Sequence, residues 1–323
     1  MILETERLVL RPWRETDAEE CYKYAKDPLV GPAAGWPVHT DVENSRQVIR
    51  DILMNPDTYA IVLKKTDLPI GSIGLRHNSQ TEKMYEAELG YWLGVPYWGR
   101  GLVPEAAHEL IRYAFEDMRL DRIWCCYFDG NMKSKRVQEK LGFRYQFTTD
   151  ITTETGLVKS RKKNVNLLTK DQWISDRIKV VDSNKRQYMQ LLLLADEQEN
   201  MIDRYLDRGT LYVLEDNGVA KAETVITIED DGIAEIKSLA VAPEYQHKGY
   251  GRSIIRFIAA LYRGRCSVLQ VGTGDSPLTV PFYKSCGFVQ HHVDKGFFLE
   301  NYDHPIIEAG MQLKDMVYLR MHL

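Results

Sequence analysis

The chain has 323 residues, of which 44% are hydrophobic and 27% are charged, and its formal net charge is −4. A chain of this length is expected to form about two domains, each large enough to bury a core. The slightly acidic balance gives no electrostatic reason to expect nucleic acid or an anionic membrane as a partner. The longest apolar stretches, such as residues 191–195, are far too short to span a bilayer.

The N-terminal residues and the cysteines bear on the compartment. Residues 1–6 have no basic segment followed by an apolar one, so they predict no signal peptide. The five cysteines are an odd number, and their spacing contains no Cys-x-x-Cys pair. This usage fits a reducing compartment, so the sequence predicts a cytoplasmic protein. No metal site is predicted, because the adjacent pair His291-His292 would point to opposite faces of a strand.

Taken in chain order, the first half alternates strands with helices. Hydrophobic periodicity and turn residues predict strands over residues 4–13, 59–64, 70–76, 91–95, 122–127 and 159–166. Helices are expected over residues 18–25, 42–53, 104–118 and 134–141, and a loop over residues 150–156. Asp41, directly before the second helix, is a capping candidate. Residues 91–95 are apolar throughout, as expected of a central strand that is buried on both faces.

The second half repeats this alternation. Strands are expected over residues 177–181, 210–215, 219–228, 233–241, 267–271 and 316–321. Helices are expected over residues 185–208, 254–262 and 280–286. The pair Asn217-Gly218 is the strongest hairpin signal in the chain, so the strands on either side of it should pair with each other.

One stretch of the second half has the composition of an anion-binding turn. The segment Gln246-His247-Lys248-Gly249-Tyr250-Gly251 lies between an expected strand and an expected helix. Glycines let the main chain turn sharply and approach a ligand, and the first N–H groups of a helix point toward a phosphate placed there. The spacing matches neither a P-loop nor a dinucleotide-binding turn. We interpret the segment as a pyrophosphate cradle; the alternative is a tight turn that binds no ligand.

The same pattern occurs twice in the chain. Trp98-Gly99-Arg100-Gly101-Leu102-Val103 has the corresponding place in the first half, and Leu141-Gly142-Phe143 there matches Cys286-Gly287-Phe288. Both landmarks recur about 150 residues later, a period far longer than that of solenoid repeats, which argues for a duplicated domain. Glu88 precedes Gly101 by one residue fewer than Glu235 precedes Gly249. The two carboxylates therefore correspond if the second copy carries one extra residue.

The second cradle resembles the acyl-CoA-binding signature of the GCN5-related N-acetyltransferases (GNAT), Gln/Arg-x-x-Gly-x-Gly/Ala, at Gln246, Gly249 and Gly251. The flanking residues 235–243 and 281–288 also look like this family. The resemblance implies two tandem α/β domains, each a mixed central sheet flanked by helices. In that fold two parallel strands splay apart, and the pantetheine arm inserts between them like an extra strand. It further implies acetyl-CoA as the cofactor, with CoA as a product.

The first half resembles the ribosomal-protein alanine N-acetyltransferase branch of the same family. The likeness lies in its cradle, in Asn131 and Ser134 ahead of residues 140–143, and in the closing residues 168–173. It places the domains at residues 1–173 and 174–323. The cradle departs from the signature, because Trp98 stands where the motif has Gln or Arg, and Val103 stands where it has Gly or Ala.

Acetyl transfer to an amine has definite chemical needs. A base must deprotonate an ammonium whose ordinary pKa is about 10.4, and the departing thiolate needs a hydrogen-bond donor. In this family the amine attacks the thioester directly. By resemblance, Tyr283 would assist the thiolate and Glu235 would be the base, directly or through a water. In the first domain Ser134 would take the place of the tyrosine, and Glu88 would correspond to Glu235. The alternatives are a core tyrosine packed with Phe282 and a solvated carboxylate at the start of a strand.

The expected cofactor-binding residues belong to the two cradles and to the strands before them. In the second domain they are Leu239, Val241, Gln246, His247, Lys248, Gly249, Tyr250, Gly251 and Arg252. In the first domain they are Leu93, Val95, Trp98, Gly99, Arg100, Gly101, Leu102, Val103 and Asn131. Trp36, Tyr91 and Trp92 are expected in the core rather than at the acceptor.

The sequence thus predicts an N-acetyltransferase that acts on a primary amine of a small molecule or peptide. The second domain is the expected catalyst, because it combines Glu235 and Tyr283 with an intact cradle. Two other functions stay open: a non-enzymatic acyl-CoA-binding or interaction module, and a protein N-terminal acetyltransferase that acts on a ribosomal protein. Residues 27–40 and 189–205 are expected to shape the acceptor pockets. Likeness to a family locates the cofactor better than it names the acceptor.

Overall fold

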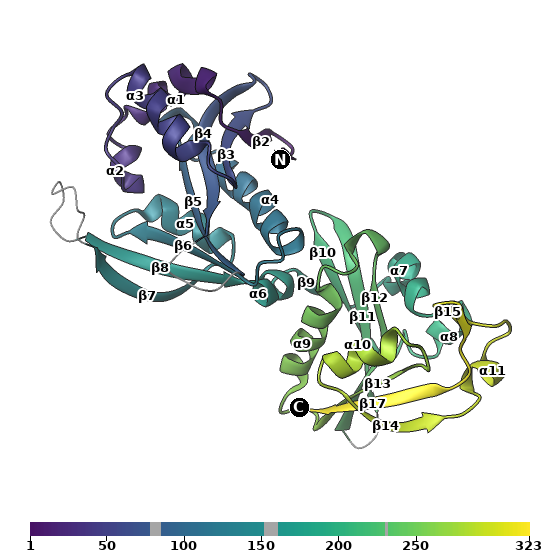
Figure 1. Ribbon diagram of the computed structural model, residues 1–323. Coiled ribbons are helices and arrows are strands. Elements are labelled where there is room, and N and C mark those ends of the chain that lie inside the picture. Colours follow the sequence, from purple (N-terminus) through teal and green to yellow (C-terminus); the bar gives the residue numbers. More distant parts are fainter. Residues whose placement is uncertain (78–84, 152–160, 230–231) are drawn as a thin grey trace. The chain divides into compact units, whose positions relative to one another are not determined.

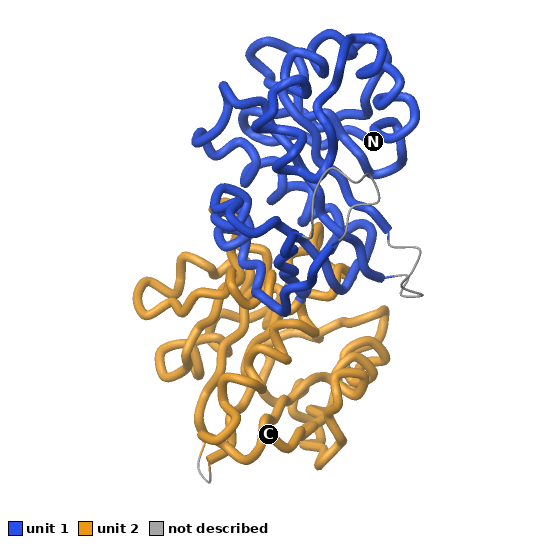
Figure 2. Tube along the Cα trace, turned by 90° about the vertical axis from the view of Figure 1, so that its left-hand side faces the viewer, with its two compact units in different colours: residues 1–170 blue, residues 171–323 orange. Residues whose placement is uncertain are grey.

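The computed structural model describes residues 1–77, 85–151, 161–229 and 232–323. The chain divides into two compact units, unit 1 over Met1–Lys170 and unit 2 over Asp171–Leu323 (Figure 2). The domain boundary after Trp173, inferred from the sequence, stays a prediction beside this division. In the described parts of the chain, no helix combines the length and the apolar character needed to cross a membrane.

Unit 1 is built on an eight-stranded sheet in the order β1-β2-β3-β4-β5-β6-β8-β7 (Figure 1). The strands are β1 (Leu3–Glu4), β2 (Leu8–Pro12), β3 (Thr58–Leu63), β4 (Leu68–Arg76), β5 (Glu86–Leu93), β6 (Arg122–Phe128), β7 (Arg144–Ile151) and β8 (Arg161–Thr169). The β5–β6 pair is parallel, and the neighbouring pairs are antiparallel. β7 was not expected from the sequence, and the part of the predicted 150–156 loop beyond Ile151 lies outside the described residues.

Helices cover both faces of this sheet (Figure 1). They are α1 (Ala18–Ala25), α2 (Gly31–Ala34), α3 (Val42–Val48), α4 (Leu102–Glu116) and α5 (Met132–Lys140), with 3₁₀ turns η1 (Glu15–Asp17) and η3 (Val95–Tyr97) and a π-helical turn η2 (Ile49–Leu53). A short helix, α6 (Lys170–Ser175), begins at the last residue of unit 1 and continues into unit 2. Asp41 caps α3 as predicted, because its carboxylate accepts a hydrogen bond from the Asn44 amide at 2.7 Å. α1 and α3 bury Cys21, Ile49 and neighbouring residues on one face, together with Trp13.

Unit 2 has a seven-stranded sheet in the order β14-β17-β13-β12-β11-β10-β9. Its strands are β9 (Ile178–Val181), β10 (Thr210–Asp216), β11 (Val219–Glu229), β12 (Ile233–Val241), β13 (Val268–Gly274), β14 (Val289–Asp294) and β17 (Met316–His322). The predicted hairpin joins β10 to β11 at Asn217 and Gly218, whose φ angles of 51° and 77° are both left-handed. A two-stranded ribbon of β15 (Ile307–Glu308) and β16 (Met311–Gln312), not expected from the sequence, lies between β14 and β17 in the chain.

The helices of unit 2 differ in extent from those predicted. They are η4 (Lys185–Tyr188), α7 (Met189–Ala195), α8 (Glu199–Asp203), η6 (Pro243–Tyr245), α9 (Tyr250–Tyr262), α10 (Thr279–Ser285) and α11 (Phe297–Asn301). Residues 185–208, predicted to be largely helical, are divided among η4, α7 and α8, because Asp196 leaves the helical conformation. Its carboxylate instead accepts a hydrogen bond from the Tyr302 hydroxyl at 3.0 Å, a tertiary contact that local periodicity does not contain.

In each unit two parallel strands pair briefly and then part. Residues 86–89 of β5 pair with residues 122–125 of β6, and β5 then continues to Leu93. Residues 233–236 of β12 pair with residues 268–271 of β13, and β12 continues to Val241. The splayed strand pair that the sequence resemblance implied is therefore confirmed in both units.

A β-bulge in β12 supplies the one extra residue that the sequence comparison required. Val225 of β11 lies opposite Ser238, but Ile226 lies opposite Ile236, so Lys237 is the additional residue. The register of β4 with β5 runs without interruption from Gly71 to Arg76. Because a bulge shifts the alternation of side chains, Glu235 and Ser238 lie on one face of the sheet although they are three residues apart.

Candidate functional site

The two predicted cradles have the same backbone. Gly101 and Gly249 each stand directly before a helix with left-handed φ angles of 75° and 89°. Two residues earlier, Gly99 and His247 are also left-handed, with φ angles of 76° and 59°. A Cβ atom on Gly99 would meet no described atom within 4 Å, so the space above this turn is open. Each turn thus directs the first N–H groups of a long helix toward an open position that suits a phosphate.

Each cradle is closed by an equivalent hydrogen bond, which a different side chain donates in each unit. In unit 2 the Gln246 amide donates to the carbonyl oxygen of Val241 at 3.0 Å. In unit 1 the indole N–H of Trp98 donates to the carbonyl oxygen of Leu93 at 2.7 Å. Leu93 and Val241 each end the strand before the cradle. Trp98 departs from the sequence signature, yet it supplies the same donor to the same position.

The end of the strand before the first cradle differs from the sequence prediction. Leu239 and Val241 of unit 2 correspond by register to Tyr91 and Leu93 of unit 1. Val95 was expected to continue the strand, but it begins the 3₁₀ turn η3. The physical reason is the following proline, which has no N–H group to donate and fixes its own φ. The contact of Val95 with the cofactor stays a prediction.

The other predicted cradle residues take several positions. Arg100 lies over the Tyr97 ring at 5.6 Å, and Lys248 lies over the Tyr245 ring at 5.6 Å. Arg252 donates to the carbonyl oxygen of Ser285 in α10 at 2.7 Å. Leu102, Val103 and Tyr250 are buried, and a Cβ on Gly251 would meet the Phe282 ring at 3.1 Å. These four therefore pack the helix behind the cradle.

The side-chain amide of Asn131 forms one hydrogen bond through its oxygen and another through its nitrogen. Its Oδ1 accepts from the Ser134 amide at 3.1 Å and caps α5. Its Nδ2 donates to the carbonyl oxygen of Ala33 at 3.3 Å and so ties α2 to the start of α5. Its predicted contact with the cofactor stays a prediction.

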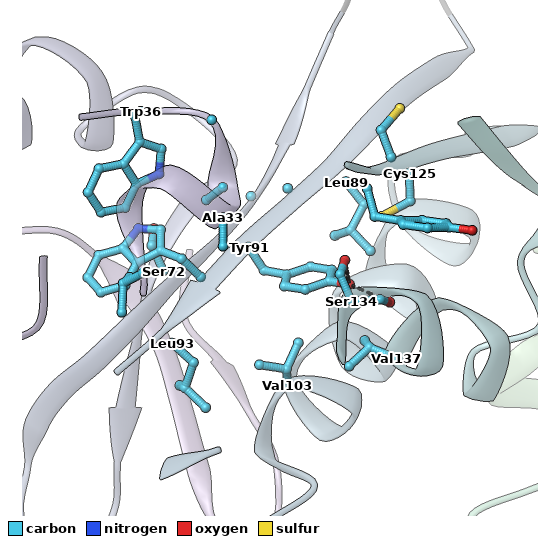
Figure 3. A pocket seen from close by; sticks show the side chains of 18 of the residues that line it. Ala33, Trp36, Ser72, Leu89, Tyr91, Leu93, Val103, Cys125, Ser134 and Val137 are labelled. Atoms are coloured by element: carbon cyan, nitrogen blue, oxygen red, sulfur yellow. Dashed lines mark hydrogen bonds between the residues drawn. The ribbon is translucent and has the colours of Figure 1, made fainter. Parts of the chain in front are cut away.

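A cavity of about 1390 Å³ runs through unit 1 where β5 and β6 separate. It extends from Gly99 and Gly101 of the cradle to Trp36 and Trp92 beside α2. Figure 3 shows Tyr91 directed at Ser134 in this cavity, with Trp36 and Ser72 at the other end of the view. Trp36, Tyr91 and Trp92 were expected in the core, but all three are partly exposed and line the cavity.

The predicted catalytic residue Ser134 belongs to a hydrogen-bond network. Its hydroxyl lies 2.9 Å from the Tyr91 hydroxyl, and the fully buried Gln138 amide donates to it at 3.2 Å. Gln138 also donates to the carbonyl oxygen of Cys126 at 3.0 Å and accepts from Asn166 at 2.7 Å. Burial raises the pKa of Tyr91 well above its ordinary value. The phenol of unit 1 thus comes from β5, whereas that of unit 2 comes from α10, and sequence reasoning missed Tyr91.

The predicted carboxylate of unit 1, Glu88, also lines the cavity. It forms an ion pair with Lys163 of β8 at 3.5 Å, and its side chain is 30% exposed. Cys126 lies beside this pair, and burial raises the pKa of its thiol to about 11. Glu88 is thus accessible and partly neutralised, whereas the thiol is kept protonated near neutral pH.

In unit 2 the two predicted catalytic residues are both buried. Tyr283 packs edge to face against Phe282 and Phe288 at 5.1 and 5.7 Å between ring centres, and burial raises its pKa far above the ordinary value. Glu235 accepts from Lys237 at 2.6 Å with one oxygen and from Gln270 at 2.8 Å with the other. The carboxylate of Glu235 therefore already has a donor on each oxygen.

A second carboxyl group of unit 2, Glu223 in β11, was missed by sequence reasoning. Its side chain is completely buried, and its Oε1 accepts from the Ser238 hydroxyl. Among the described residues, its Oε2 and the nearby hydroxyl of Tyr205 have no hydrogen-bond partner. Burial raises the pKa of Glu223 to about 8, and its charge reaches Tyr283. The available signal was a lone carboxylate in an apolar strand, which is rarely buried without a purpose.

Comparison with known proteins assigns both halves to one family. Residues 7–144 and residues 207–290 each match a family model described as an acetyltransferase (GNAT) domain. The chain is 31% identical over 151 residues to the uncharacterized N-acetyltransferase YvbK of Bacillus subtilis, covering 46% of this chain and 96% of that protein. It is 34% identical over 147 residues to the uncharacterized N-acetyltransferase p20 of Bacillus licheniformis, and the match covers 44% of this chain and 82% of that protein.

Solved structures include an acetyltransferase of Bacillus subtilis in complex with CoA. It is 32% identical to this chain, with a TM-score of 0.43, and the match covers 46% of this chain and 98% of that one. From its two family domains and its relatives, the chain belongs to the GNAT family of acetyltransferases, and it is an N-acetyltransferase whose cosubstrate is acetyl-CoA.

Proposed function

We propose that unit 2 transfers the acetyl group of acetyl-CoA to a primary amine of a small molecule or peptide by direct attack. The observation that carries this proposal is Glu223. It is a completely buried carboxyl group, and Oε2 accepts from no group in the described part of the chain. It lies on the face of the sheet covered by α7 and α8, because its neighbour Val225 belongs to the core that these helices form.

Acetyl-CoA supplies the thioester carbonyl that the amine attacks. The cradle at Gly249 would hold its pyrophosphate, and the main chain of Leu239 and Val241, beyond the point where β12 leaves β13, would pair with its pantetheine arm. Glu223 lies directly opposite Ala240, between those two residues in the register of β11 with β12. The carboxyl group would therefore lie beside the pantetheine arm.

Glu223 is the better base of the two carboxylates in unit 2. In its ionised form, a carboxyl group with a pKa of about 8 would take a proton from an ammonium more readily than a carboxylate of lower pKa, because its proton affinity is closer to that of the amine. The Glu235 carboxyl group is instead held by an ion pair with Lys237 and by a hydrogen bond from Gln270. Tyr283, kept neutral by burial, would donate a hydrogen bond to the departing thiolate.

The test compares two isosteric changes, Glu223→Gln and Glu235→Gln, in the full chain. Acetylation of a panel of primary amines is followed by the release of CoA, and acetyl-CoA binding is measured by calorimetry. We expect Glu223→Gln to lower kcat by roughly 100-fold or more, as loss of a general base does, while acetyl-CoA still binds. If Glu235→Gln is the variant that loses kcat and Glu223→Gln is active, the role returns to Glu235.

A second pair of variants locates the reaction. A glutamate at either cradle glycine would place a negative charge against the pyrophosphate. Gly249→Glu should therefore abolish the acetylation proposed for unit 2, and Gly101→Glu should leave that acetylation unchanged. The opposite result would assign the reaction to unit 1. Circular dichroism of each variant checks that it is folded.

A further inference from the structure

The two units carry different residues on the sheet face where an acceptor amine would bind. In unit 1 the cross-strand neighbours Gly74 of β4 and Gly90 of β5 leave this part of the sheet without side chains. The corresponding positions of unit 2 hold Val225 and Ser238. Both glycines line the cavity of unit 1, so its floor is bare main chain.

Backbone geometry does not require glycine at position 90. Its φ is not among the left-handed values, and a Cβ there would meet the Arg76 guanidinium at 3.4 Å, which is ordinary contact with the end of a flexible side chain. At Gly74 a Cβ would meet the Thr58 hydroxyl at 3.0 Å, which is tighter. Gly90 is therefore a position where a side chain fits the fold but would fill the recess.

Aromatic rings form one wall of this recess. Trp92 follows Gly90 by two residues and so lies on the same face, with its ring edge to face against Trp36 at 5.8 Å between centres. Trp13 stacks behind Trp92 at 6.1 Å, and its indole donates to Ser72 at 3.1 Å. Ser72 and Trp92 correspond by register to Glu223 and Ala240, so unit 1 has an aromatic wall where unit 2 has a buried acid.

The fold holds Trp36 in this position. A Cβ on Gly31 would overlap the Trp36 ring at 2.7 Å, so the indole rests directly on the start of α2. α2 is tied down by Arg161, which donates to the carbonyl oxygen of Pro32 at 2.9 Å, and by Asn131. The surrounding rim is apolar and exposed, with Leu29 and Ile52 both 58% exposed and both lining the cavity.

A charged pair closes the other side of the recess. Glu88 lies opposite Arg76 in the register of β4 with β5, two residues from Gly90 and therefore on the same face. The recess thus runs from two indole rings, over two glycines, to a carboxylate. An indole wall favours an aromatic or apolar body, and a carboxylate favours a nearby ammonium.

We propose that unit 1 holds a second acceptor site, which takes a primary amine borne on an aromatic or bulky apolar group. The ammonium gives one proton to Glu88, its nitrogen bonds to the thioester carbonyl carbon, and the carbon–sulfur bond breaks. The proton that the nitrogen loses on forming the amide goes to the thiolate, which leaves as CoA. This site goes beyond the function proposed for unit 2 and does not depend on Glu223.

The test uses 2-phenylethylamine as the probe, with the full chain carrying Gly249→Glu so that the second cradle cannot accept the cofactor. Its binding is measured by tryptophan fluorescence and calorimetry in the presence of CoA, and its acetylation by CoA release. In this background the added change Gly90→Val should weaken probe binding at least tenfold, and Trp36→Ala should do likewise. The added change Trp124→Ala, which removes an indole outside the cavity, is the matched control and should not weaken binding.

The inference is overturned if the probe does not bind, if Gly90→Val binds it as well as the parent chain, or if Trp124→Ala weakens binding as much as Trp36→Ala. A probe that binds but is not acetylated overturns the transfer step. Catalysis by unit 2 is measured separately in the Gly101→Glu chain, whose first cradle cannot accept the cofactor. Failure of either proposal is therefore visible without the other.

Discussion

Glu223 makes the stability of the protein depend on pH in a specific direction. Its pKa is raised from an ordinary value of 4.5 to about 8 in the folded protein. Between these values the folded state keeps a proton that the unfolded state has lost, so the free energy of unfolding falls as pH rises. Below about pH 4.5 both states are protonated, and above about pH 8 both are ionised, so the dependence is confined to this window.

The variant Glu223→Gln should lose this dependence. A shift of one pKa unit corresponds to about 1.4 kcal/mol, so ionisation of Glu223 costs on the order of several kcal/mol at alkaline pH. We expect the Tm of Glu223→Gln, measured by calorimetry, to rise relative to that of the wild type as pH increases from 6 to 9. Glu235→Gln is the control. A constant difference between Glu223→Gln and wild type over this range would show that Glu223 does not titrate there.

At the scale of single residues, sequence reasoning named candidate side chains but could not name the groups that they contact. It identified Glu235 and Ser134, but it could not show that Glu235 has a donor on each oxygen or that Ser134 contacts Tyr91. Those donors come from other strands. Whether these residues act in catalysis stays a prediction.

At the scale of elements, each cradle consists of a strand, a turn and a helix, and one hydrogen bond joins the turn to the end of the strand. Trp98 and Gln246 are interchangeable in this respect, because both donate to the last carbonyl group of the preceding strand. Trp98→Gln should therefore keep the closure, whereas Trp98→Phe removes the donor and keeps the ring. Loss of such a bond should cost about 1 kcal/mol.

Thermal unfolding and acetyl-CoA titration of these two variants test the closure. We expect Trp98→Phe to be the less stable of the two and to bind acetyl-CoA more weakly at the first cradle. Should Trp98→Gln be the weaker variant in both measurements, the ring and its contact with Lys133, at 3.7 Å, would matter more than the donor.

The bulge in β12 is an element whose effect extends across the sheet. If β12 ran as a regular strand through Lys237, Glu235 and Ser238 would lie on opposite faces, because they are three residues apart; the bulge keeps them on one face. The sequence indicated one extra residue by comparing the intervals before the two glycines. It did not identify the residue, since that is decided by which N–H and C=O groups β11 pairs.

At the scale of the whole molecule, the duplication predicts two sites for the cosubstrate. Both cradles have left-handed glycines before a helix, and both strand pairs splay. Calorimetric titration should therefore give close to two acetyl-CoA per chain, and Gly101→Glu and Gly249→Glu should each reduce the value to one. A value of one that is lost in Gly249→Glu alone would contradict a working cradle in unit 1.

The sequence alone determined the family, the fold class, the enzyme class and the cosubstrate, and the comparisons and structure confirm these predictions. It could do so because the cradles and the Asn217-Gly218 hairpin depend on local backbone geometry, which glycine spacing encodes directly.

Only the tertiary structure decided which residues line the acceptor site proposed for each unit. Glu223, Ser238 and Tyr205 come from three separated segments, and the recess of unit 1 comes from paired strands and α2. Their proximity follows from strand register and long-range packing, which local sequence patterns do not specify.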